Sequence, residues 1–140
     1  SVRIGLQLVT VQARRHELAL ILGAWMEEDG WTVTEATRPL VASRTVAVGH
    51  ARSIVPASLD AYRADLQLSL WVNEGDDDES VDELYARLSP GEKSIQFFLT
   101  NHPTFTIADG VTVGGVAARE EGPTTFLVAS LIVPVMVRET

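Results

Sequence analysis

The chain of 140 residues contains no cysteine. Disulfide bonds, thiolate metal sites and a thiol nucleophile are therefore excluded. Cationic residues are also few, because 11 lysine and arginine residues stand against 19 aspartate and glutamate residues, for a formal net charge of −8. A surface that grips nucleic acid needs clustered cations to replace the counterions of the phosphates, so this composition argues against one. It is compatible with a surface that stays close to DNA without adhering to it.

Long uninterrupted hydrophobic runs are absent as well. The longest, residues 126–129 and 131–137, are too short to span a bilayer. No basic segment precedes a long apolar stretch near Ser1, so we expect no signal peptide. Hydrophobic residues make up 46% of the chain and charged residues 21%, which is a globular composition. A chain of this length fits one domain, and we expect a single α+β domain over residues 1–140.

Motifs of catalysis and ligand binding are missing too. The three histidines, His16, His50 and His102, lie far apart, and the sequence has no His-Glu-x-x-His, no Gly-x-Ser-x-Gly elbow and no phosphate-binding glycine loop. The acidic run at residues 76–79 lacks the spacing of a calcium loop. A solvated turn that precedes a helix N-terminus accounts for it better. We therefore expect no catalytic residue, no metal site and no cofactor.

Residues 63–88 have the clearest local pattern. Apolar residues alternate with mostly polar ones, which indicates a strand with one face on a core; the apolar set is Leu66, Leu68, Leu70 and Val72. After the acidic turn, Ser80 and Glu83 fit a capping box. Apolar residues then follow at the spacing of one helix face, namely Val81, Leu84, Tyr85 and Leu88. We expect a short helix at residues 80–88 that folds back over the core face of the strand.

The N-terminal third of the chain predicts a long helix and two short strands. The helix is expected to begin near Gln7 or Thr10 and to end at Asp29, although alternation in the first eight residues also fits a strand. Its apolar stripe consists of Leu18, Ile21, Leu22 and Trp25. Strands are expected at residues 31–35 and 44–48. Residues 49–62 have no period and contain glycine and proline, so they predict a long loop or a bent extension. Loops of that length are often functional or mobile.

The C-terminal third predicts a hairpin. Residues 94–100 fit either a strand or the end of a helix. A strand at residues 111–119, with a bulge at the glycine pair 114–115, leads through a turn to the longest strand at residues 124–138. The whole order predicts an α+β fold, with a mostly antiparallel sheet and with a long N-terminal helix and a short second helix packed on one face.

The last strand is apolar on both faces. One face carries Leu127, Ala129, Leu131, Val133, Val135 and Val137. The opposite face is dominated by Phe126, Val128, Ile132 and Met136. The outer face of a two-layer α+β domain should be polar. Either the strand is covered on both sides within its own fold, or another subunit covers the outer face, because large apolar patches are rare on soluble monomers.

The charges are unevenly distributed along the chain. Acidic residues gather around residues 74–83 and 120–121. The positive charge is concentrated in the first half, at Arg14, Arg15, Arg38, Arg44, Arg52 and Arg63. Such a distribution can pair one subunit with the next around a ring, or it can reflect two ordinary solvated faces.

The order of elements resembles that of the tail terminator proteins of siphophages, which belong with the head–tail joining proteins. The resemblance rests on a long N-terminal helix, short strands with a long loop at 49–62, an alternating strand that ends in Leu70-Trp71-Val72, an acidic turn with a short helix, and a closing hairpin. It covers nearly the whole chain. It implies a structural virion protein that forms a hexameric ring, caps the tail tube, ends tube polymerisation and joins the tail to the head connector or head-closure protein.

The resemblance also implies where the chain works and with what. It implies assembly in the host cytoplasm, a place in the tail or neck of the virion, and DNA that passes through the lumen without specific binding. It implies no catalysis and no membrane. The candidate residues for a subunit or tube interface are the four outer-face residues of the last strand and, in the predicted loop, His50, Arg52, Ile54 and Val55. The alternative is a small α+β enzyme or ligand-binding domain with a pocket under the 49–62 loop.

Overall fold

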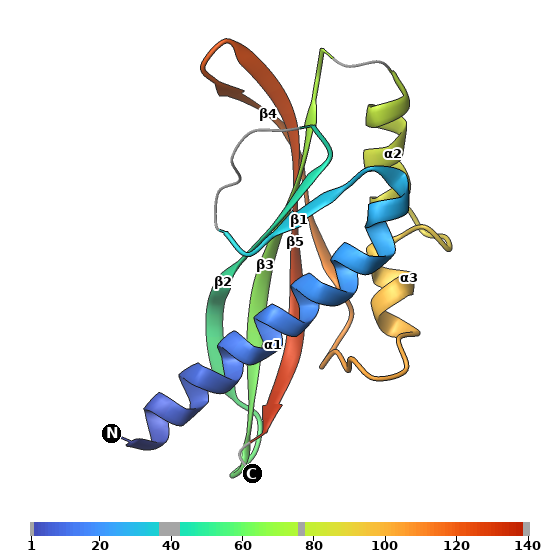
Figure 1. Cartoon of the computed structure of the whole chain (residues 1–140). Helices are drawn as coiled ribbons and strands as arrows, with labels where there is room; N and C mark the ends of the chain where they lie inside the picture. The colour runs from blue at the N-terminus through green and yellow to red at the C-terminus, as the bar shows by residue number, and fades with distance from the viewer. Residues whose placement is uncertain (1, 37–42, 76–77, 139–140) are drawn as a thin grey trace.

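The computed structural model describes residues 2–36, 43–75 and 78–138, with side chains from Val11 onward (Figure 1). These residues form α1 (Val2–Met26), the 3-10 helix η1 (Glu27–Asp29), β1 (Thr32–Thr34), β2 (Thr45–Pro56), β3 (Ala61–Asn73), α2 (Asp78–Leu88), α3 (Ile95–Thr100), β4 (Thr112–Glu121) and β5 (Thr124–Arg138). The α+β class is therefore confirmed. The acidic run at 76–79 lies partly outside the described residues. Among the described residues, no helix combines the length and the hydropathy that crossing a bilayer requires.

The five strands form one mixed sheet in the order β1-β2-β3-β5-β4. The β2–β3, β3–β5 and β4–β5 pairs are antiparallel, as expected. The β1–β2 pair is parallel, with Val33 beside Val46. A strand of only three residues shows no sign of its direction in the sequence, so the mostly antiparallel prediction missed the parallel pair.

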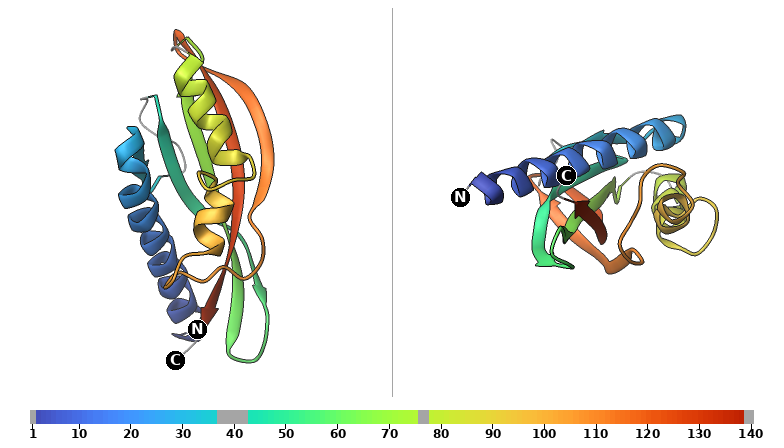
Figure 2. Two further views of the ribbon diagram at one scale, coloured as in Figure 1. Left: turned by 90° about the vertical axis from the view of Figure 1, so that its right-hand side faces the viewer. Right: turned by 90° about the horizontal axis from the view of Figure 1, so that it is seen from below.

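One face of the sheet, which we call the first face, carries the hydrophobic core. On β3, Leu66, Leu68 and Leu70 are fully buried, and the register places them beside alternate residues of β5 that are buried as well. Side chains of all three helices belong to the same core cluster; they include Leu18, Leu22 and Met26 of α1, Leu84 of α2, and Ile95 and Leu99 of α3. Figure 2 shows α1 along the sheet and α2 above α3 in a column beside it. We call the opposite side of the sheet the second face.

A buried arginine links the end of α1 to α2. Arg87 of α2 is 1% exposed, and its guanidinium lies over the Trp25 ring, 4.4 Å from the ring centroid. It donates hydrogen bonds to the carboxylates of Asp29 and Glu83, the latter at 2.9 Å. Glu83 also accepts from Lys93 Nζ at 2.7 Å. Burial raises the pKa of Glu83, but these hydrogen bonds and the neighbouring positive charge outweigh it, so the pKa lies below its ordinary value.

The predicted capping box is therefore wrong. The α2 helix begins at Asp78, two residues before Ser80, so Ser80 lies inside the helix and not at its N-cap. The Ser80 hydroxyl accepts a hydrogen bond from Arg44 Nε at 3.0 Å, and Glu83 serves the ion pairs described above. Both side chains therefore bind residues outside the predicted motif, Arg44 and Arg87, and do not form the local capping box.

Of the two alternatives for residues 49–62, the long loop is wrong and the bent extension is closer, because these residues form a β-hairpin. β2 continues to Pro56 and β3 begins at Ala61. The pairing of the two strands shifts register twice, between Val48 and Ala51 and again between Ala51 and Ser53. A bulge inserts an extra residue and breaks the alternation of faces. The hairpin therefore shows no period of two in the sequence.

The helical segment ends at Asp29 as predicted, although its last three residues form the 3-10 helix η1. Gly30 follows in the left-handed conformation, with φ of 80°. The β4–β5 pairing shifts register between Val113 and Gly115, at the predicted bulge. The sequence left residues 94–100 open between a strand and the end of a helix. Residues 95–100 form the short helix α3, and the Ser94 hydroxyl caps it by accepting from the Phe97 backbone N–H at 3.0 Å.

Candidate functional site: the second face of the sheet

The second face carries three of the apolar side chains that the sequence assigned to a partner. Val128, Ile132 and Met136 alternate along β5 with side chains of the core, so they point to the other side of the sheet. All three are half-buried, and none belongs to the core cluster. Among the described residues, the buried apolar side chains of the helices all belong to that cluster. The apolar row on β5 therefore lies on the side of the sheet that the core does not use.

Phe126 differs from the other three because its own chain already covers it. Its side chain is 1% exposed, and its ring meets Trp71 of β3 edge to face, with 5.8 Å between the ring centroids. The guanidinium of Arg119, from β4, lies 5.3 Å from the centroid of the Trp71 ring. Phe126 therefore packs within its own chain and has almost no surface left for a partner.

Polar side chains of β2 and β3 share the second face. Asp65 accepts hydrogen bonds from Arg63 Nε at 2.9 Å and from Ser53 Oγ at 2.7 Å. Burial raises the pKa of Asp65, but these hydrogen bonds and the charge of Arg63 outweigh it, so the pKa lies below its ordinary value. The second face thus combines an apolar row on β5 with neutralised polar groups beside it, which is the mixture found at protein interfaces.

The other four candidate residues lie on the β2–β3 hairpin, at the lower end of the sheet in Figure 1. Val55 pairs with Arg63, which pairs in turn with Met136, so Val55 belongs to the second face. Ile54 pairs with Ala64 and points to the first-face side. Both are exposed, Ile54 at 39% and Val55 at 49%.

His50 and Arg52 lie next to the two bulges of β2. The ring of His50 hydrogen-bonds to Gln12 of α1 at 3.1 Å, which places it on the helix side of the sheet. Arg52 is exposed. The structure thus brings Val55, Val128, Ile132 and Met136 onto one face, with His50 and Ile54 on the other. Phe126 shares the second face but is buried within its own chain.

The sequence did not reveal the sheet edges. β4 is an edge strand, and its residues are exposed along nearly the whole length. Val113 and Val116 are 41% and 40% exposed, and their pairing with β5 places them on the first-face side, where they are not part of the core. At the other edge, β1 pairs with β2 only at residues 45–47. The sequence shows that the β4 segment is largely uncharged and contains glycine. It does not show that this strand lies at the edge of the sheet, because that depends on the strand order.

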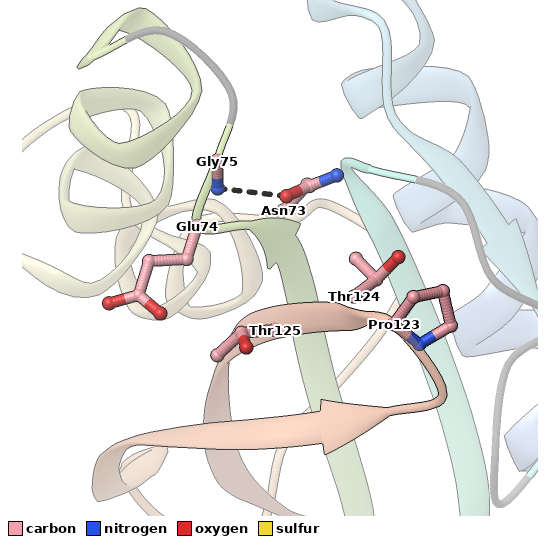
Figure 3. Close-up of a pocket in the computed structure, with 6 residues that line it drawn as sticks. All are labelled: Asn73, Glu74, Gly75, Pro123, Thr124 and Thr125. Atoms are coloured by element: carbon pink, nitrogen blue, oxygen red, sulfur yellow. Dashed lines mark hydrogen bonds between the residues drawn. The ribbon is translucent and has the colours of Figure 1, made fainter.

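The described pockets are shallow and do not converge on reactive groups. One of about 410 Å³ lies between the end of β3 and the β4–β5 turn (Figure 3), lined by Asn73, Glu74, Gly75, Pro123, Thr124 and Thr125. Of these six residues, Glu74 alone is charged. A second, of about 260 Å³, lies beside the stacked rings of Trp25 and Phe98. The residues of the predicted 49–62 loop form the hairpin, and none of them lines either of these two pockets.

The histidines are dispersed. His16 pairs with Glu35 at 2.8 Å, and the His102 ring accepts from the Phe105 backbone N–H at 2.9 Å. In the described part of the chain, no three His, Asp or Glu side chains gather in a way that could hold a metal ion. Comparison with protein-family models finds no match, and no curated protein matches the chain in sequence. The surfaces of the chain are therefore the basis for proposing its function.

Proposed function

We propose that this chain is a structural protein of a phage-like virion. In this proposal its copies form a hexameric ring that caps the tail tube, ends tube polymerisation and joins the tail to the head connector or head-closure protein. The helices serve the first face of the sheet, and the second face is the contact surface for a neighbouring copy or for the tube. The chain acts by assembly and performs no chemistry.

The observation that carries the proposal is the apolar row on the second face. Val128, Ile132 and Met136 lie outside the core cluster and are half-buried in the single chain. Fully burying a side chain of this kind contributes about 1.5–3 kcal/mol, so covering what remains exposed of three half-buried ones adds at most about that amount. Contiguous apolar surface outside the core is typical of interaction surfaces on soluble proteins.

Two further features support the proposal. The order of elements that resembles tail terminators is present, although a hairpin replaces the predicted loop and α3 is an additional helix. The net charge of −8 suits a ring through which DNA passes, because a lumen that repels phosphates does not retain the DNA. On this proposal the chain is assembled in the host cytoplasm and resides in the tail or neck of the virion.

The substitution Ile132→Asp tests the proposal. An unpaired charge buried in a contact costs several kcal/mol. Ile132 is only half-buried in the single chain, so the carboxylate of the introduced aspartate can reach water there and loses it in the contact. We expect a folded variant by circular dichroism that fails to form rings on tails and fails to join them to heads.

Leu20→Asp is the matched control. Leu20 lies on α1 and is 60% exposed, so the same change of an aliphatic side chain to a carboxylate leaves the second face intact. Leu20→Asp should assemble as the wild type does. If Ile132→Asp forms rings on tails as readily as Leu20→Asp, the second face is not the interface.

A further inference from the structure

We propose that the outer edge of β4 in one copy pairs, antiparallel, with the outer edge of β2 in the next copy, at residues 49–56. The sheet would then continue from copy to copy. The closure of the paired copies into a ring rests on the proposed function. The pairing of the two strands is argued from their exposed edges alone.

The β4 edge lacks most of the features that protect edge strands. It is ten residues long, and its first seven residues, 112–118, carry no charge and no proline. Natural sheets protect such edges with short strands, lysine, proline or bulges, because unpaired backbone groups are a template for another strand. β4 has one bulge, at Gly115, and it exposes Val113 and Val116 beside its edge.

The β2 edge is open below the short β1 strand. β1 reaches only residues 45–47 of β2. The next carbonyl along, that of Val48, accepts a hydrogen bond from Arg15 Nε of α1 at 3.0 Å. Among the described residues, no strand pairs with the outer edge of β2 at residues 49–56.

The topology sets the direction of the pairing. β2, β3, β5 and β4 alternate in direction across the sheet, so β2 and β4 run in opposite directions within one copy. A second copy placed alongside in the same orientation therefore brings its β2 antiparallel to β4 of the first. An edge that meets a different edge in this way is a head-to-tail contact, which repeats from copy to copy and closes a ring when the rotation fits.

The side chains complement each other in that direction and not in the other. Antiparallel pairing places Val113 and Val116 of β4 near Ile54 of β2, and it places Glu120 toward the end of the segment that carries Arg52. Val116 and Ile54 lie on the same side of a continuous sheet, because their partners Ala129 and Ala64 both face the core. Apolar and opposite-charge neighbours across strands are favourable. Parallel pairing in the same register, with Val116 opposite Ile54, would instead carry Glu120 past Ile54 to the level of residue 58, away from Arg52.

Cysteine cross-linking tests the pairing against a background without native thiols. The double variant Ile54→Cys with Val116→Cys is oxidised in two samples, the concentrated purified chain and tails that contain it. A second double variant, Ile54→Cys with Val113→Cys, tests the alternative register that the bulges allow. Cβ atoms of neighbours across antiparallel strands lie about 4.5–5.5 Å apart, close to disulfide distance. We expect at least one pair to give a ladder of linked dimers, trimers and larger species on a non-reducing gel, and each single variant to give none.

The control pair is Leu20→Cys with Ile54→Cys, because Leu20 is exposed on α1 and reports random collision. A ladder from this control as strong as that from the edge pairs would overturn the proposal. Dimers from Val116→Cys alone would also overturn it, since they would show two β4 edges pairing about a twofold axis. So would the absence of a ladder from both edge pairs in both samples.

Charge exchange is a second and independent measurement. Arg52→Glu should lower the yield of the ladder several-fold, and adding Glu120→Arg should restore it. An unchanged yield in both variants would contradict the predicted direction of the strands. The two proposals can fail separately. If the purified chain gives a ladder but tails assemble normally without the chain, the edge pairing stands and the role in the virion is wrong. Tails that contain the chain but yield no ladder would remove the edge pairing alone.

Discussion

Replacing the buried Arg87 by methionine removes the centre of the contacts between α1 and α2. Arg87 is 1% exposed, it donates to Asp29 and Glu83, and it stacks on Trp25. Methionine is unbranched and flexible and fills the space of the arginine stem, so the variant keeps much of the packing while it removes the guanidinium. Two carboxylates then lose their shared cation.

The size of the effect follows from how exposed the two carboxylates are. Removing one partner from a buried ion pair costs about 3–5 kcal/mol, because the other charge is left unpaired. The side chain of Asp29 is 41% exposed, so water replaces much of what it loses. The side chain of Glu83 is 11% exposed but keeps Lys93 at 2.7 Å. Loss of the cation–π contact with Trp25 adds about 1 kcal/mol. We expect Arg87→Met to lower the free energy of unfolding by about 2–4 kcal/mol.

Urea denaturation measures this difference directly, from the midpoint and slope of the unfolding transition. Arg87→Lys is the matched control, since it keeps the charge but not the planar group that stacks and forms two hydrogen bonds. Its loss should be clearly smaller than that of Arg87→Met. A loss below about 1 kcal/mol for Arg87→Met would show that the buried arginine does not hold α2 to the end of α1.

Two further predictions concern the stability of the single chain. The pKa of Glu83 is lowered in the folded state, so its contribution to stability is present well above 4.5, its ordinary value, and is lost as the pH falls through the lower folded value. Glu83→Gln should therefore flatten the dependence of the unfolding free energy on pH below about 5. An unchanged slope in acid would contradict this. Leu68 is fully buried on β3, so Leu68→Ala should cost about 2–5 kcal/mol in urea denaturation. Leu20→Ala, at an exposed site, should cost less than about 0.5 kcal/mol, and equal losses at the two sites would show that the β3 core face is misassigned.

The core could be predicted from the sequence wherever hydrophobic period and burial coincide. Residues 66–72 of β3 and the strand β5 alternate as they do in the structure, and the stripe of Leu18 and Leu22 faces the core from α1. These elements are long and regular, so a period of two or 3.6 survives in the sequence. The bounds of β5, Thr124–Arg138, agree with the predicted strand.

The remaining fold depended on irregularities and tertiary partners. Two bulges interrupt the alternation of residues along β2, so the sequence of the hairpin resembled that of a loop. Ser80 and Glu83 matched a local capping motif, yet Arg44 and Arg87 bind them from other parts of the fold. Local patterns cannot reveal a competition that is decided by residues distant in sequence.

The candidate site was predicted in part for the same reasons. The alternation of β5 correctly placed Val128, Ile132 and Met136 on the face away from the core. It also placed Phe126 there, but the sequence could not show that Trp71 packs against it. The exposed edge at Val113 and Val116 depends on which strand ends the sheet, and strand order is a property of the whole fold.

Electron microscopy of phage tails that carry a labelled form of this chain tests the central claim most directly. The account predicts a closed ring of six labelled copies at the end of each tail that meets the head, and tails of uncontrolled length that join no head when the chain is withheld. Tails of normal length that join heads without the chain would contradict the account, as would label found as single copies away from that end.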